Sequence, residues 1–318
     1  MAYRKHRRFQ AKAARPSNSR TTREGFKLKI NSKDFRVPSG KKVELDEWPT
    51  TVDHFFKSTE QYHELLAAHV EGLSSRQQLH CASGRYALLL IFQGMDSAGK
   101  DGAIRHVMSG VNPEGCEVYS FKQPSVEELK HDFLWRTTCR LPERGRIGIF
   151  NRSYYEEVLI TRVHPAILDT QNLPNRSRNT KHFWRDRYRS IVELEAHLHR
   201  NGTQIVKFFL HLSKKEQAKR FLERIDEPDK NWKFSASDIH ERKYWQHYMH
   251  AYGQCLAETS THHAPWYSVP ADDKDNARLI VSQILMDAFD DLKMAYPKSA
   301  PKRLRELQAI GKRLLKSA

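Results

Sequence analysis

The chain has 318 residues, of which 39% are hydrophobic and 29% charged, as is typical of a folded globular protein. Its longest uninterrupted apolar run, Tyr86–Phe92, is far shorter than the roughly 18 residues of a membrane-spanning helix, so we expect no membrane span. We also expect no Sec-type secretion signal, because no apolar N-terminal stretch precedes a cleavage site. The four cysteines lack C-x-x-C spacing, which argues against a disulfide framework or a cysteine zinc site and favours the cytoplasm.

The formal net charge of +16 is concentrated at the two ends of the chain. Residues 1–30 carry a net charge of +9 and residues 297–318 one of +6, which leaves 37 basic and 36 acidic residues between them. We expect residues 1–40 to form a disordered basic arm, with ordered structure beginning near Trp48. The arm fits a solubilising extension, a loose anion-binding segment or a transit peptide. Residues 297–318 are expected to form a basic tail, in which one helix would place Leu304, Leu307, Ile310 and Leu314 on one side.

Residues 41–296 are expected to form one domain of alternating helices and strands. A helix is predicted over 52–79, followed by a buried strand over Tyr86–Gln93 that ends at Gly94 and leads into another helix. Further strands are predicted at 117–121, 146–150, 204–212 and 266–269, and further helices at 126–139, 182–199 and 276–292. A capping box of Ser213 and Glu216 predicts a helix that runs to Ile225. This alternation predicts an α/β fold with a parallel five-stranded sheet covered on both faces.

The segment GMDSAGKDG lies between the first predicted strand and the helix after it. Gly94 and Gly99 allow successive backbone N–H groups to surround an anion, and the helix N-terminus adds positive potential. Lys100 is placed to reach the outer phosphates of a bound chain. The spacing predicts a phosphate-binding loop, with an ordinary glycine turn as the alternative. The proposed binding residues of this loop are Gly94, Met95, Asp96, Ser97, Ala98, Gly99, Lys100, Asp101 and Gly102.

The metal site of this loop is predicted to differ from the common one. Asp101 follows Lys100, where a generic phosphate loop has the Ser or Thr that holds Mg²⁺. Asp96 is predicted as the metal ligand, because a carboxylate beside a phosphate repels it unless a cation intervenes. An Asx turn that shapes the loop is the alternative.

A second group of polar residues, NRSYYEE, follows the predicted strand at 146–150. Such a strand delivers its last residues to the carboxyl edge of the sheet, where open α/β folds bind their ligands. Arg152 can hold phosphate oxygens with its planar guanidinium, and a surface salt bridge is the alternative. Glu156 or Glu157 could bind Mg²⁺ or position an acceptor, and we expect at least one of the two to be a solvated helix residue.

Together with Trp232-Lys233, THHAPW (261–266) and PADDK (270–274), these two segments resemble the polyphosphate kinase 2 family over residues 79–292. The resemblance implies a thymidylate-kinase-like P-loop fold with a helical lid around residues 213–245. It also implies Mg²⁺-dependent transfer of phosphoryl groups between inorganic polyphosphate and nucleotides. GMDSAGKDG with NRSYYEEVL is most similar to the subgroup that phosphorylates nucleoside mono- and diphosphates.

The resemblance also implies residue roles. Lys100 matches the family's phosphate-loop lysine, Asp96 its metal-associated aspartate and Arg152 the arginine that contacts the phosphate chain. Asn151 stands where many relatives have aspartate, which puts direct ligation there in question; the implied metal site is Asp96 with Asn151, for Mg²⁺ or alternatively Mn²⁺. Glu157 stands where the close subgroup has aspartate, which leaves the nucleotide preference open.

Residues 219–233 match the family's lid. Arg220 and Arg224 lie four apart on one predicted helix face, and Lys230 and Lys233 follow in a loop. Such cations can stabilise charge on transferring oxygens, although any one of them could instead be a solvated surface charge. Arg162 completes the set of proposed binding residues. A further basic run over 176–189 either follows a long anion or faces water.

The sequence is interpreted as an enzyme, a kinase that transfers the terminal phosphoryl group of polyphosphate to AMP or ADP, or to GMP or GDP, reversibly in principle. Asp96, Lys100, Arg152 and Arg224 are the expected catalytic residues. An ATP-dependent nucleoside monophosphate kinase of the same fold remains an alternative, as does a nucleic-acid-binding protein that uses the basic tails, although no RNA-recognition motif is apparent. The resemblance implies a dimer or tetramer, with the number left open.

Overall fold

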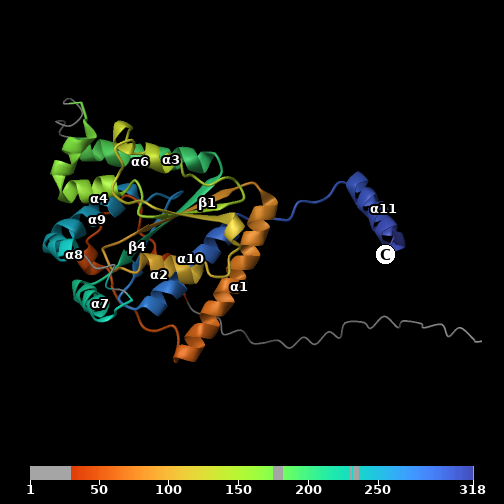
Figure 1. Cartoon of the computed structure of the whole chain (residues 1–318), viewed down its shortest axis with the longest axis horizontal. Coiled ribbons are helices and arrows are strands. Elements are labelled where there is room, and N and C mark those ends of the chain that lie inside the picture. The colour runs from red at the N-terminus through yellow and green to blue at the C-terminus, as the bar shows by residue number, and fades with distance from the viewer. Residues whose placement is uncertain (1–29, 175–181, 230, 232–235, 318) are drawn as a thin grey trace, which may run out of the picture.

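The computed structural model describes residues 30–174, 182–229, 231 and 236–317. Its centre is a sheet of five parallel strands in the order β2-β3-β1-β4-β5, which Figure 1 shows between two layers of helices. The strands are β1 (Ala87–Gln93), β2 (Cys116–Ser120), β3 (Ile147–Asn151), β4 (Thr203–His211) and β5 (Trp266–Pro270). The predicted α/β fold and all five predicted strands are therefore confirmed.

Helices cover both faces of the sheet. One layer contains α1 (Thr59–Ser83), α2 (Lys100–Val107) and α10 (Lys274–Asp291), and the other contains α4 (Glu156–Val163), α6 (Phe183–Arg200) and α9 (Trp245–Thr259). The remaining helices are α3 (Trp135–Thr138), α7 (Lys214–Asp226), α8 (Ala236–Glu241) and α11 (Pro301–Ser317). The predicted cap at Ser213 is confirmed, since its side chain accepts a hydrogen bond from the Glu216 backbone N–H at 3.0 Å. The reciprocal bond of a capping box is replaced, because the Ser213 N–H donates to Asp272 Oδ1 at 2.7 Å.

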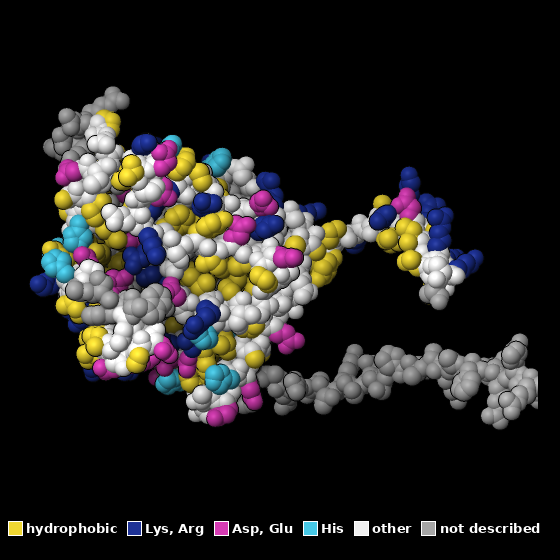
Figure 2. Space-filling view, viewed as in Figure 1, with side chains coloured by type: hydrophobic (Ala, Val, Ile, Leu, Met, Phe, Trp, Pro, Cys, Tyr) yellow, Lys and Arg dark blue, Asp and Glu magenta, His cyan; other side chains and the backbone are white. Residues whose placement is uncertain are grey.

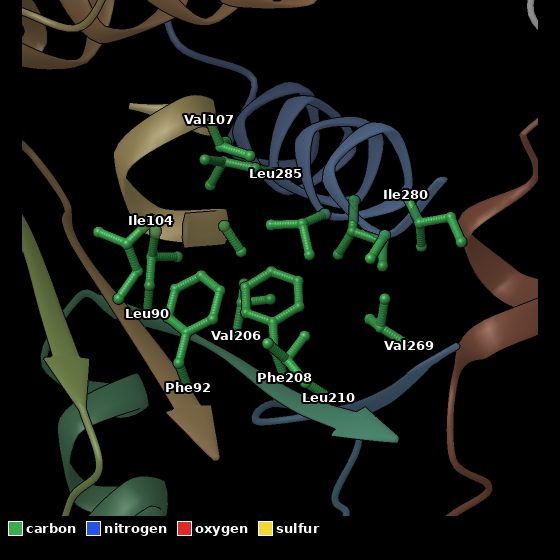
Figure 3. Packing of buried hydrophobic residues seen from close by; sticks show 14 of the residues in the cluster. Leu90, Phe92, Ile104, Val107, Val206, Phe208, Leu210, Val269, Ile280 and Leu285 are labelled. Carbon is green, nitrogen blue, oxygen red and sulfur yellow. The ribbon is translucent and has the colours of Figure 1, made fainter. Parts of the chain in front are cut away.

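Strand β1 is apolar from Ala87 to Phe92 because both of its faces are buried. Leu90 and Phe92 face α2 and α10, whereas Leu89 and Ile91 belong to the core on the opposite face. Figure 3 shows the first of these cores, in which the rings of Phe92 and Phe208 stack with their centroids 4.8 Å apart. This packing holds the carboxyl ends of β1 and β4 in fixed positions next to each other.

Several expected boundaries differ from the structure. Helix α1 begins at Thr59 rather than at residue 52, because Ser58 caps it and accepts a hydrogen bond from the Gln61 N–H. The helix predicted over 126–139 is wrong: that stretch contains only a 3₁₀ turn at Glu128–Lys130 and the single turn α3. Side chains there bond nearby backbone N–H groups, as Asp132 does with Leu134 at 2.9 Å, and so compete with a continuous helix.

The body of the fold begins earlier than expected. Ile30, Phe35 and Val37 are buried, and Arg36 forms a bridge to Tyr267 of β5. Residues 30–37 therefore pack on the sheet and do not belong to a disordered arm. The expectation that ordered structure begins near Trp48 is wrong. Residues 1–29 lie outside the described residues.

Helix α11 lies apart from the body at the end of an extended connection (Figure 1). None of its described residues is buried, and Figure 2 shows apolar side chains on one of its sides and Lys and Arg on the other. The apolar residues are Leu304, Leu307, Ile310, Leu314 and Leu315. In the part of the chain that the structure covers, no helix combines the length and the apolar character needed to cross a membrane.

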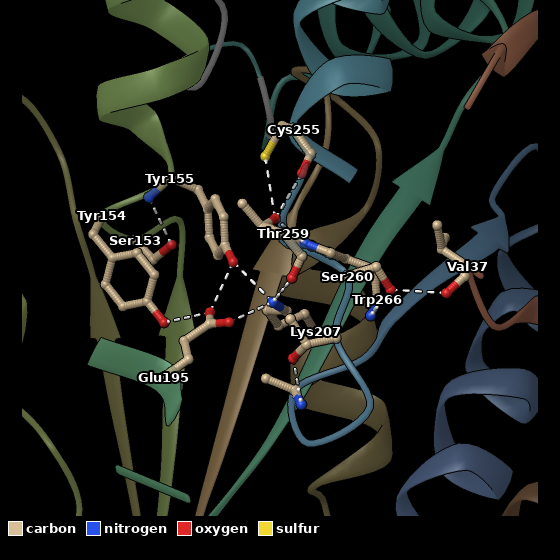
Figure 4. Close-up of polar contacts among 12 residues, drawn as sticks. Val37, Ser153, Tyr154, Tyr155, Glu195, Lys207, Cys255, Thr259, Ser260 and Trp266 are labelled. Atoms are coloured by element: carbon tan, nitrogen blue, oxygen red, sulfur yellow. Dashed lines mark hydrogen bonds and ion pairs between the residues drawn. The ribbon is translucent and has the colours of Figure 1, made fainter. Parts of the chain in front are cut away.

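A buried polar network ties β4 to the segment after β3 (Figure 4). Lys207 of β4 and Glu195 of α6 are both fully buried, with Nζ and Oε2 2.6 Å apart. The Lys207 ammonium also donates to the Tyr155 hydroxyl and to the Thr259 carbonyl, each at 2.8 Å, so all three of its protons have acceptors. Tyr154 donates to the same carboxylate at 2.9 Å. The network fixes Tyr154 and Tyr155, which follow Arg152 after the single residue Ser153.

Candidate functional site

A cleft of about 1330 Å³ opens at the carboxyl edge of the sheet, around the ends of β1 and β3. These strands are neighbours, with Phe92 of β1 opposite Asn151 of β3. The loop after β1 and the polar segment after β3 therefore meet at one place, the expected position for a ligand in an open parallel sheet. Asp96 to Ala103 line one wall, and Asn151, Arg152, Glu156 and Glu157 line another.

The backbone of the loop requires glycine at two positions. Gly94 has φ +153°, and a Cβ there would lie 2.9 Å from the Leu210 carbonyl oxygen of β4. Gly99, the N-terminal cap of α2, has φ +98°. Ser97 between them adopts φ +65°, an uncommon conformation for a residue with a side chain. The loop is thus curled tightly ahead of a helix N-terminus, which is the arrangement that binds phosphate through backbone N–H groups.

Lys100 is held inside this loop. Its residue is only 8% exposed, and Nζ donates to the carbonyls of Gly94 at 2.7 Å and Met95 at 3.2 Å. Gly94 and Met95 do not line the cleft themselves, so their part in the geometry is to hold the lysine. The ammonium is therefore already in place before an anion arrives.

Arg152 joins the two walls. Its Nη2 lies 2.6 Å from Asp96 Oδ1 and its Nη1 lies 3.3 Å from Glu156 Oε2. The neighbouring charge of Glu156, followed by that of Asp96, raises the pKa of Arg152 above its usual value. The backbone at Arg152 has φ +64°, in the left-handed region. Such a conformation costs about 1 to 3 kcal/mol and persists only when its surroundings impose it.

Asn151 and Asp101 also meet across the cleft, since Asn151 Nδ2 donates to Asp101 Oδ1 at 2.5 Å. This bond turns the amide so that its carbonyl oxygen is the atom left for a cation. Among the described residues no group of three His, Cys, Asp or Glu side chains could hold a metal ion. A set of one carboxylate and one amide oxygen nevertheless fits Mg²⁺, which commonly takes its other ligands from water and substrate phosphates.

The structure changes the interpretation of Arg220, which was expected as a lid cation. It is buried, and it donates to backbone carbonyls of Ser97 at 2.9 Å and Ala271 at 2.6 Å. Gln217, one turn earlier on α7, donates to the Asp96 carbonyl at 3.0 Å. Helix α7 therefore supports the phosphate loop from behind, and both Arg220 and Arg224 line the cleft.

Other expected site residues are placed differently. Both Glu156 and Glu157 are buried, at 9% and 5% exposure, so the expectation that one of them is solvated is wrong. Within the described chain Arg162 is not part of the cleft lining: it bonds the Tyr188 hydroxyl at 3.1 Å and stacks on Trp184. Lys230 and Lys233 lie outside the described residues.

The residues that line the rest of the cleft form two groups, which we call its arms, and of their members named here sequence patterns revealed only Arg224. A basic arm runs along α2, α7 and α10 and includes Arg105, Arg224, Lys274 and Arg278. A mixed apolar arm lies between the loop after β2 and helix α4 and includes Phe121, Leu129, Ile160 and Ile167, together with Arg136 and Gln171. Lys274 and Arg278 are four apart at the start of a helix, a spacing that could have drawn attention to them.

The charge of Lys100 predicts a pH dependence. Burial, aided by the nearby charge of Arg152, lowers the pKa of Lys100 to about 8. The free protein therefore carries the ammonium below that pH and loses it as the pH rises. We expect kcat/KM for an anionic donor to fall above pH 8, approaching about tenfold per pH unit, since kcat/KM reports the free enzyme.

The control for this prediction is Lys100→Arg, whose guanidinium stays charged throughout the range. Its remaining kcat/KM, measured between pH 6.5 and 9.5, should lack the falling limb at high pH. A wild-type profile that stays flat through this range would show that the ammonium charge does not govern binding.

Comparison with known proteins agrees with this geometry. The family model for polyphosphate kinase 2 matches residues 56–297. The ADP-polyphosphate phosphotransferase of Rhodopseudomonas palustris is 64% identical over 289 residues, covering 91% of this chain and all of the relative. The AMP/ADP-polyphosphate phosphotransferase of Meiothermus ruber is 40% identical over 267 residues, covering 84% of this chain and 96% of the relative.

A solved structure shares the whole fold. The crystal structure of polyphosphate kinase 2 from Arthrobacter aurescens TC1 matches with a TM-score of 0.78 and 38% identity, covering 89% of this chain and 97% of the other. The match therefore extends beyond the phosphate loop to the sheet and both helical layers. On the evidence of its sequence and of its fold, this chain belongs to the polyphosphate kinase 2 family.

Proposed function

We propose that this protein transfers the terminal phosphoryl group of inorganic polyphosphate to AMP or ADP, or to the guanine equivalents, reversibly in principle. The observation that carries the proposal is one cleft in which a phosphate loop lies between a basic arm and a mixed apolar arm. The names of the relatives, which include ADP- and AMP/ADP-polyphosphate phosphotransferases, support the same reaction.

The basic arm suits a phosphate chain. Arg278 is held in place by Tyr62, whose hydroxyl accepts a hydrogen bond from its Nη1 at 3.0 Å, and by Asp275 at 2.7 Å. Lys274 lies 3.5 Å from Glu223 of α7, so this arm links α10 to α7. Phosphates of an extended chain could contact these cations in turn, and no base needs to be recognised.

The mixed apolar arm suits the nucleoside of an acceptor. Its apolar side chains can cover the faces of a base, while a few polar groups fix the orientation. Arg136 forms part of this arm and its Nε, which is buried, has no hydrogen-bond partner among the described residues. The acceptor phosphate would then lie between this arm and Lys100.

In the proposed mechanism, an oxygen of the acceptor phosphate attacks the terminal phosphorus of polyphosphate directly. A new P–O bond forms, the bond to the bridging oxygen breaks, and the chain leaves one phosphate shorter. Lys100 and Arg152 neutralise charge on the transferring oxygens, and Arg224 is proposed to do the same from α7. Asp96 and Asn151 would hold Mg²⁺, or alternatively Mn²⁺, which supplies further charge neutralisation when bound.

We also propose that the segment around residues 213–245 acts as a lid, within which Gln217 and Arg220 of α7 stay in place against the phosphate loop. We propose further that the protein is a cytoplasmic homo-oligomer, a dimer or a tetramer. The exposed apolar side of α11 supports assembly, since a second copy could cover it.

The donor experiment tests the proposed function. Purified protein with Mg²⁺ and polyphosphate should convert AMP to ADP and ATP with no nucleoside triphosphate added, because the basic arm offers contacts for the phosphates of a donor chain. Products are separated by ion-exchange chromatography. A chelator should stop the reaction.

The control offers ATP as the sole donor to AMP, GMP and dTMP. Fast turnover with ATP and none with polyphosphate would replace this proposal with an ordinary nucleoside monophosphate kinase. The reverse pattern would support the polyphosphate reaction.

A further inference from the structure

Three polar side chains from different elements meet at the mixed apolar arm, and we call them the Arg187 cluster. Glu157 belongs to α4, Gln171 ends the 3₁₀ helix Pro165–Gln171, and Arg187 belongs to α6. Arg187 Nη1 donates to Glu157 Oε2 at 3.2 Å and to the Glu157 backbone carbonyl at 3.0 Å. Gln171 accepts a hydrogen bond from Arg187 Nη2 and donates to Glu157 Oε2 at 2.6 Å.

Arg187 is buried and held rigidly. It is 5% exposed, and its guanidinium lies 4.8 Å from the ring centroids of both Phe133 and Phe183. Two aromatic contacts together with a bidentate pattern of donors leave it few alternative positions. Arg187 is therefore neither a solvated charge nor a contact for a long anion, the two roles considered for the basic run over 176–189.

The cluster presents one side to the cleft. Glu157 and Gln171 line the cleft, whereas Arg187 stands behind them. Glu157 Oε2 already accepts from Gln171 and Arg187, which leaves Oε1 as the oxygen of this carboxylate able to accept from a ligand. A carboxylate only accepts hydrogen bonds, so its ligand must bring a donor group.

We propose that Arg187 is a positioning residue that presents Glu157 and Gln171 as a hydrogen-bonding edge for the nucleoside of the acceptor. This inference rests on the proposed function and extends it to acceptor recognition. The groups recognised are hydrogen-bond donors, which a nucleoside carries as ribose hydroxyls or as an exocyclic amino group. A site built for such a donor discriminates strongly against an analogue that lacks it, because the carboxylate is then left unpaired.

The experiment measures nucleotide binding by calorimetry in the absence of polyphosphate. Wild type and Arg187→Met are titrated with three nucleotides. ADP carries both kinds of donor group, 2′-deoxy-ADP lacks the 2′-hydroxyl, and inosine diphosphate lacks the exocyclic amino group. The matched control is Arg189→Met, since Arg189 lies on the same helix but is exposed and pairs with Glu193, one turn away. Polyphosphate binding is measured separately.

Arg187→Met should weaken ADP binding by about tenfold or more, the effect expected when a hydrogen bond to a charged group is lost. Wild type should bind ADP more tightly than at least one of the analogues. In the variant, the ratio of the two dissociation constants should fall toward one. Polyphosphate binding and the control variant should stay within twofold of wild type, by the usual small effect of surface changes. Arg187→Lys, which keeps the charge without the planar fork, should give an intermediate result.

Unchanged ADP binding, or equal weakening of all three nucleotides, would overturn the proposal. If Arg187→Met does not fold, the same titrations are made with Gln171→Ala, whose substitution lies at the cleft surface. This variant should also lose the preference for ADP over the analogue. Because no polyphosphate is present in the nucleotide titrations, their outcome does not depend on which donor the enzyme uses. Failure of the proposed reaction would instead appear as missing turnover in the donor experiment.

Discussion

Lys100→Met should lower kcat by about 10² to 10³ while the protein remains folded, the usual effect of removing one preorganised donor from a site of developing charge. Methionine has nearly the same length as lysine and suits a buried position, so the substitution mainly removes the charge. The loop loses two hydrogen bonds to the Gly94 and Met95 carbonyls, but its backbone is still fixed by Arg220 and Gln217 from α7. Stopped assays at saturating polyphosphate and nucleotide measure kcat, and circular dichroism checks the fold.

The control is Lys130→Met. Lys130 is exposed, pairs with Glu127 and does not line the cleft, so kcat should stay near the wild-type value. A folded Lys100→Met protein with nearly normal kcat would refute the catalytic role. A raised KM with unchanged kcat would show that the lysine contributes only to substrate binding. An interaction made equally with the bound substrate and with the transition state does not raise kcat.

The parts of the fold that sequence predicted are those with a local signal. The phosphate loop could be located because its glycines are required by backbone conformation, as Gly94 and Gly99 are here. Strand β1 could be located because burial on both faces makes its first six residues, Ala87–Phe92, apolar. The position of Arg152 followed from the rule that parallel strands end at one edge of a sheet.

What sequence did not predict depends on contacts between distant segments. Arg187 and Arg189 look alike in the sequence, yet one is buried between two aromatic rings and the other is exposed. Arg220 has the spacing of a surface cation but is buried against the phosphate loop. Helix α9 was missed because polar and apolar residues alternate irregularly along it, although it is largely buried.

The Lys207 and Glu195 pair was also missed, although one signal was available. Lys207 stands in the middle of QIVKFFLHL, a run otherwise suited to a fully buried strand. A charge at such a position requires a partner of opposite charge, because burying it alone is costly. The signal indicates that a partner exists, but only the fold identifies it as Glu195, twelve residues earlier on α6.

Lys207→Met should destabilise the protein by about 3 to 5 kcal/mol, the usual cost of removing one partner from a buried ion pair. Glu195 would remain fully buried with its charge unbalanced, and the Tyr155 hydroxyl and Thr259 carbonyl would each lose a donor. Since Tyr154 and Tyr155 are anchored by this network and lie only two and three residues after Arg152, we also expect lower activity at temperatures where the variant is still folded. Urea unfolding followed by tryptophan fluorescence measures the free energy of unfolding.

Two further variants separate the charge effect from simple repacking. Lys42→Met, at an exposed residue that pairs with Glu44, should change the free energy of unfolding by less than about 0.5 kcal/mol. The double variant Lys207→Met with Glu195→Met removes both charges and should be more stable than Lys207→Met alone, because no uncompensated charge is left in the core. Glu195→Met is measured alone as well. If the losses of unfolding free energy in Lys207→Met and Glu195→Met simply add up to the loss in the double variant, the two charges do not stabilise each other, and the network holds Tyr154 and Tyr155 only through packing.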